Sequence, residues 1–177
     1  SDDSSFWMDP SLNVTTIPYA LLSSEQMFKS MSSVTNTPIS ASSMNEYNAR
    51  QAVFASGYDL KLVTSPMLIA VTNLSSVFCN ETVTRERNLP AAQRRLFSDI
   101  DFTKSINDVS TQNFQGAAQK MSQAFWGRSP SSVELQILSE GKAEFFSALT
   151  AQEASATASS RNLMLFTCTA MLSSFDS

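Results

Sequence analysis

The chain has 177 residues, of which 42% are apolar and 16% charged, and its net charge is −4. It has no histidine, which excludes Ser-His and Cys-His nucleophile pairs, histidine metal ligands and histidine proton shuttles. The acidic balance gives no reason to expect nucleic acid, which needs clustered Lys and Arg, and no apolar run approaches the roughly 20 residues of a membrane-spanning helix.

Residues 1–20 are typical of an extended N-terminal arm, which precedes a single helical domain over residues 21–177. Pro10 and Pro18 interrupt this segment, and its apolar residues follow no helical period. An arm with aromatic residues near its start usually docks on a surface, either its own core or a neighbouring molecule. The predicted docking residues are Phe6, Trp7, Met8, Ile17 and Tyr19.

Helix start and stop signals then follow in series. Most starts combine a serine at the N-cap with Glu or Gln three residues later, or with proline at the first helical position. The expected helices run from about Ser23 to Asn36, Ser43 to Gly57, Ser65 to Arg87, Pro90 to Phe97, Ser110 to Trp126, Ser131 to Leu149 and Leu163 to Leu172. Six or seven helices with short joints and only four glycines indicate an all-α fold, an irregular helical bundle.

Residues 99–108 alternate between polar and apolar side chains, which favours a short strand or an extended link. The oxygen-bearing side chains from Asp99 to Asn107 also fall at alternating positions, as in a calcium loop. That loop needs a glycine at its sixth position and a glutamate at its twelfth, and both are missing here. We therefore expect a strand or turn with one wet face, and no metal site.

Four basic residues, Arg85, Arg87, Arg94 and Arg95, cluster in the middle of the chain. Acidic residues interleave with them, which predicts a solvated helix face.

Cys79 and Cys168 lie 89 positions apart, each in a predicted helix with apolar neighbours. They are too few for a four-cysteine zinc site or a C-x-x-C motif. One interpretation is a disulfide that joins the third helix to the last in an oxidising compartment. The other is a pair of buried thiols that behave as small hydrophobic residues.

Catalysis without histidine could use paired carboxylates, for which Asp99, Asp101 and Glu134 are the candidates if two of them face each other across a cleft. The sequence contains no G-x-S-x-G, S-x-x-K or phosphate-binding loop. Its methionines are typical of core packing rather than of a cofactor site. We expect no cofactor and no enzymatic activity.

Three short segments resemble a family of helical secreted bacterial domains of unknown function, found with planctomycete-type cytochrome modules. Residues 21–28 resemble its LT-x-x-EY opening helix, residues 125–134 its RRP-x-T-x-x-E helix start, and residues 168–174 its ALL-x-SP-x-F closing helix. The resemblance implies an exported helical bundle without established catalytic residues. The chain lacks C-x-x-C-H, so haem attachment is not implied.

The charged fraction is below the roughly 25% of an average soluble domain, and uncharged polar residues take its place. Such a surface suits an exported protein or a subunit packed in an assembly. We therefore expect a non-enzymatic structural or interaction subunit of a bacterial envelope or surface assembly, with protein partners or self-assembly. Two alternatives stay open: a helical module that binds a small apolar ligand or peptide, and a carboxylate-dependent hydrolase.

Overall fold

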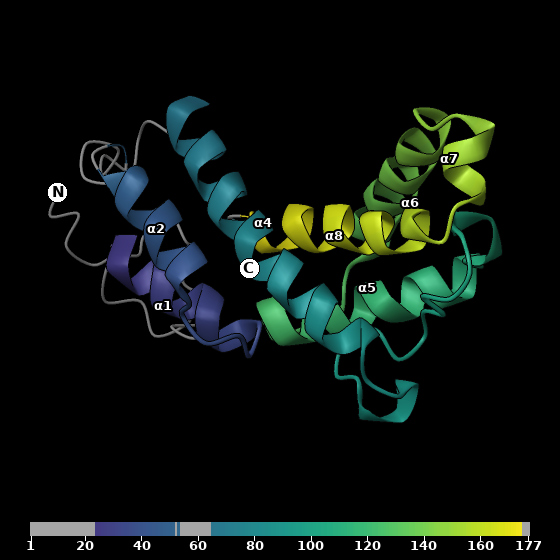
Figure 1. Cartoon of the computed structure of the whole chain (residues 1–177), viewed down its shortest axis with the longest axis horizontal. Coiled ribbons are helices and arrows are strands. Elements are labelled where there is room, and N and C mark those ends of the chain that lie inside the picture. Colours follow the sequence, from purple (N-terminus) through teal and green to yellow (C-terminus); the bar gives the residue numbers. More distant parts are fainter. Residues whose placement is uncertain (1–23, 52, 54–64, 175–177) are drawn as a thin grey trace, which may run out of the picture.

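The computed structural model describes residues 24–51, 53 and 65–174, so the predicted N-terminal arm lies outside the described residues. Within the described ranges the chain forms α-helices and 3₁₀ turns and no strand, which confirms the all-α prediction (Figure 1). The α-helices are α1 (Ser24–Val34), α2 (Ala41–Ala49), α4 (Ser65–Arg87), α5 (Thr111–Trp126), α6 (Ser132–Ser147), α7 (Ala151–Ser155) and α8 (Ala158–Leu172). No helix in these ranges combines the length and apolar character needed to cross a bilayer.

The centre of the fold is the crossing of α4 and α8, which contact each other more extensively than any other pair of helices. Figure 1 shows α1 and α2 on one side of α4, and α5, α6 and α7 gathered along α8 on the other. The side chains at the crossing are apolar and fully buried, and their removal from water supplies the main driving force for this packing. They include Val71, Leu74, Phe78, Leu163 and Met164.

Cys79 of α4 and Cys168 of α8 form a disulfide at this crossing. Their Cα atoms are 5.8 Å apart, within the usual range for bonded cysteines, and both residues are completely buried. Of the two interpretations drawn from the sequence, the structure contains the disulfide.

Several helix ends follow the local chemistry of the sequence. Ser131 and Glu134 form the predicted capping box of α6, and Gly127 ends α5 in the left-handed region, with φ 70°. The predicted start of α2 at Ser43 is wrong. Ser40 is the N-cap, because its hydroxyl accepts from the Ser43 amide while the Ser43 hydroxyl accepts from the Ser40 amide.

The expected helix from Pro90 to Phe97 is also wrong, since only one 3₁₀ turn, Ala91–Gln93, forms there. Side chains take the place of helical hydrogen bonds. One oxygen of Glu86 accepts from the amides of Leu96 and Phe97, at 2.9 and 3.1 Å. The guanidinium of Arg94 donates to the carbonyls of Leu89 and Ile100.

Residues 99–108 form turns and a second 3₁₀ turn, Ile106–Asp108, rather than a strand. Ile100 and Ile106 are buried, while Asp101 and Thr103 lie in solvent. The expected wet face is therefore present on a turn. Thr103 donates to the Asp101 carboxylate, and the Asn107 amide donates to the Ser105 hydroxyl. These local hydrogen bonds fix the backbone here in place of the hydrogen bonds that a strand would make to a neighbouring strand.

The basic cluster is a solvated helix face only in part: Arg87 is exposed at the end of α4, whereas Arg94 and Arg95 lie beyond that helix. Arg85 donates to the Thr37 hydroxyl and the Thr35 carbonyl, at 3.1 and 3.2 Å, and Arg95 donates to the Val34 carbonyl at 2.6 Å. The Arg85 bonds tie the end of α1 to the end of α4, and the Arg95 bond ties it to the segment that follows α4. The arginines satisfy carbonyl oxygens that a turn leaves without backbone partners.

Candidate functional site

Helix α6 exposes large apolar side chains. The sequence predicted this helix from its apolar residues, which would ordinarily face the core. None of its residues is fully buried, and Val133, Ile137 and Phe146 are 64%, 60% and 46% exposed. Its apolar residues spread around several faces instead of forming one stripe toward the core. Exposed apolar side chains that gather on one region mark a binding surface more often than scattered ones do.

A groove lies between α4, α6 and α8, where Figure 1 shows α4 and α6 on either side of α8. Its larger part has a volume of about 520 Å³, and no charged side chain lines it. A second hollow of about 280 Å³ shares Ala170 with the first and extends past Ile137 to Trp126. The apolar walls of this α4/α6/α8 groove are Phe145, Leu165, Phe166, Ala170, Ile137 and Leu138.

Two aromatic rings form the wall between α6 and α8. The centroids of Phe145 and Phe166 are 5.4 Å apart with the ring planes tilted by 33°, a common arrangement for an attractive aromatic pair. Phe166 remains 46% exposed and presents one side of this pair to the groove. At the far end Trp126 is held in place, since its indole N–H donates to the Met171 carbonyl at 3.3 Å.

Two buried hydroxyl groups in the groove have no hydrogen-bond partner among the described residues. They belong to Thr169 on α8 and to Ser173 at its C-cap, one turn further on, and both residues line the larger part of the groove. A buried hydroxyl without a partner costs free energy, on the order of 1–3 kcal/mol. The larger part of the groove thus combines an uncharged, mostly apolar surface with two buried hydroxyls, which a bound molecule can reach if their side chains rotate toward it.

The three carboxylates considered for catalysis have other contacts in the structure. Asp99 forms an ion pair with Lys120 of α5. Asp101 accepts hydrogen bonds from the hydroxyl and the amide of Thr103, which lower the pKa of this exposed carboxyl. Asp99 and Asp101 line a shallow hollow of about 270 Å³, whereas Glu134 lines a different one beside Trp126.

Glu134 is 22% exposed and is held by the bidentate guanidinium of Arg128, at 2.7 and 2.9 Å. The hydrogen bonds from Arg128 are the main cause that lowers the pKa of Glu134 to about 2, and the Ser131 amide adds to them. Because the pKa is lower in the folded than in the unfolded state, the ionised carboxylate stabilises the fold at neutral pH.

We expect this contribution, about 1–3 kcal/mol, to be present above about pH 5 and to be lost as the pH falls toward 2. Glu134→Gln should therefore destabilise the protein at neutral pH and by less at about pH 3. Urea denaturation across this pH range measures the difference. Glu144→Gln, in the same helix but exposed, is the matched control. A Glu134→Gln penalty that does not shrink with acid would contradict the prediction.

The structure joins Cys79 to Cys168, and the arm residues from Phe6 to Tyr19 lie outside the described residues.

The groove residues were not predicted as a site. The available signal was the apolar pattern of α6, whose residues cannot all fit on one buried face. Within the described ranges no three Asp, Glu or Cys side chains come close enough together to hold a metal ion.

No protein-family model matches the chain, and no curated protein or solved structure is significantly similar to it. Function is therefore inferred from the geometry of the groove and its surroundings.

Proposed function

We propose that this protein is a non-enzymatic interaction subunit of an exported bacterial envelope or surface assembly, and that the α4/α6/α8 groove is its docking site. The observation that carries the proposal is the larger part of this groove, which is mostly apolar, has no charged lining residue among those described and holds two unsatisfied hydroxyls, Thr169 and Ser173. An apolar peptide segment suits such a surface, because its side chains cover the aromatic walls while its backbone supplies hydrogen-bond partners.

The occupant that we propose is the N-terminal arm of a second copy of the chain. Residues 10–24 carry no charged side chain, which matches the uncharged larger part of the groove. Figure 1 shows α1 on the side of α4 that faces away from α8, so the arm joins the domain away from its own groove. The 23 residues before α1 span at most about 75 Å when extended, enough to reach a neighbouring molecule.

The disulfide supports the exported location, because such bonds persist in oxidising compartments and are rare in the cytosol.

Self-association of the full chain tests the docking proposal. We expect sedimentation velocity to show association that strengthens with concentration. Phe166→Asp places a charge in the groove, and Ile17→Asp combined with Tyr19→Asp does so in the uncharged part of the arm. Each change should weaken association at least about tenfold, as loss of an interface aromatic commonly does. Met44→Asp, at an exposed apolar residue of α2 outside the groove, is the matched control and should leave association unchanged.

A mixture of the two variants makes the test directional. The Phe166→Asp protein keeps its arm and the Ile17→Asp/Tyr19→Asp protein keeps its groove, so together they should form a one-to-one complex although each associates only weakly alone. A wild-type chain that remains monomeric at all concentrations contradicts the proposal. So does association that is insensitive to Phe166→Asp.

A further inference from the structure

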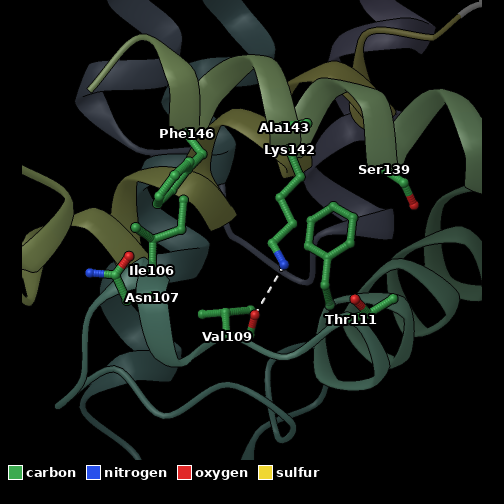
Figure 2. Close-up of a pocket in the computed structure, with 9 residues that line it drawn as sticks. Ile106, Asn107, Val109, Thr111, Ser139, Lys142, Ala143 and Phe146 are labelled. Carbon is green, nitrogen blue, oxygen red and sulfur yellow. Dashed lines mark hydrogen bonds between the residues drawn. The ribbon is translucent and has the colours of Figure 1, made fainter. Parts of the chain in front are cut away.

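A separate cavity of about 390 Å³ lies on another face of α6, between this helix and the start of α5. Figure 2 shows the Lys142 side chain pointing from α6 toward Val109, with Ile106 and Phe146 on one side and Thr111 and Ser139 on the other. Its walls are mostly apolar, and its volume falls within the range of small-molecule sites, roughly 300–1,000 Å³. It is not part of the α4/α6/α8 groove.

Of the described residues that line this cavity, Lys142 alone is charged. Its ammonium Nζ donates to the Val109 carbonyl at 3.0 Å and lies 5.5 Å from the centroid of the Phe114 ring. Both partners are neutral. Among the described residues no carboxylate lies within ion-pair distance of Lys142, so its positive charge is half-buried without a negative partner.

Burial lowers the pKa of Lys142, which means that the apolar surroundings disfavour its charged form. The hydrogen bond to Val109 and the contact with Phe114 do not outweigh this cost, because the pKa of Lys142 is still lowered. A bound anion offsets it, since an ammonium ion and a carboxylate in an apolar site form a strong charge-assisted hydrogen bond. One of the three N–H donors of Lys142 is used by Val109, and the ammonium group has two more.

We propose that this cavity binds a small aliphatic monocarboxylate, with its carboxylate on Lys142 and its alkyl chain against Ile106, Val109 and Phe146. A single negative charge matches the single lysine. The apolar walls give no second cation for a phosphate or a dicarboxylate, and they favour an alkyl chain of several carbons. The proposal is independent of the docking groove, because neither of the two hollows of the groove shares a lining residue with the cavity.

Titration of the full chain with butanoate, hexanoate and octanoate tests the proposal by isothermal calorimetry and by amide chemical shifts. We expect affinity to rise along the series and shifts to cluster at Thr111, Ser139 and Lys142. Hexanamide, which has the same shape without the charge, should bind at least about tenfold more weakly. Lys142→Met should weaken hexanoate binding to the same extent, whereas Lys29→Met, the same charge change on an exposed residue of α1, should leave it unchanged.

The comparison of hexanoate with hexanamide needs only the wild-type chain, so it decides the proposal even if Lys142→Met fails to fold. Equal binding of these two compounds overturns it. So does full hexanoate affinity in a folded Lys142→Met protein, or the absence of any shift around the cavity with octanoate. Inorganic phosphate that binds more tightly than hexanoate overturns the assignment to carboxylates.

Discussion

Replacement of Cys79 and Cys168 together by alanine is expected to lower the free energy of unfolding by about 4 kcal/mol. The disulfide closes a loop with a sequence separation of 89 residues, and a cross-link of this span removes much of the conformational entropy of the unfolded chain. Both cysteines are completely buried where α4 crosses α8, so their replacement also removes the covalent link between the two central helices. Urea denaturation of the oxidised proteins measures the difference.

Reduction supplies the matched control for this prediction. Wild-type protein in excess reductant should lose most of the same free energy, while the double alanine variant should not respond to reductant at all. Thiol labelling of the unfolded, non-reduced chain should find no free cysteine. Labelling of two thiols would contradict the presence of the disulfide. So would a free energy of unfolding of the wild-type protein that does not change in reductant. The result also tests the proposed export of the protein, because a chain whose stability depends on this disulfide needs an oxidising compartment.

Glu86→Ala is expected to destabilise the protein by about 3 kcal/mol. Glu86 is 2% exposed, and one of its oxygens accepts from the amides of Leu96 and Phe97, two residues that are completely buried. Removal of the carboxylate leaves two buried N–H groups without an acceptor, each at a cost of roughly 1–3 kcal/mol. Thermal and urea denaturation measure the loss, and amide exchange should show the largest loss of protection at Leu96 and Phe97.

Glu86→Gln distinguishes hydrogen bonding from charge. Both amides bond to the same oxygen, and glutamine keeps an oxygen at that position, so this variant should retain most of the stability that Glu86→Ala loses. Glu140→Ala, at an exposed position of α6, controls for loss of a glutamate elsewhere. A Glu86→Ala protein as stable as the Glu140→Ala protein would contradict the assigned role.

The helices that the sequence predicted correctly are those whose ends depend on nearby residues. Ser131 and Glu134 satisfy each other's amides within one turn, and Gly127 adopts a left-handed conformation that costs other residues more. The segment from Pro90 to Phe97 failed as a prediction because Glu86, outside the segment, accepts from the amides of Leu96 and Phe97, while Arg94 within it donates to the Leu89 carbonyl. A propensity pattern cannot report a carboxylate ten residues away that competes with helical hydrogen bonds.

The candidate site was less predictable than the fold. The sequence identified Cys79 and Cys168 as a long-range pair, but it left open whether they are bonded. It did not identify Phe145 and Phe166 as a paired wall, because each looks like a core residue within its own helix. Their exposure depends on how α6 rests on α8, which is a property of packing.

The sequence alone determined the helical class, the start and end of α5, the start of α6 and the absence of histidine chemistry, because each depends on composition or on residues within a few positions of one another. The tertiary structure alone decided which apolar residues stay exposed. It also decided where Thr169 and Ser173 face a groove and how Lys142 comes to lie among apolar side chains without a carboxylate. These features depend on how separate helices pack against one another, and the local sequence of one helix does not determine that packing.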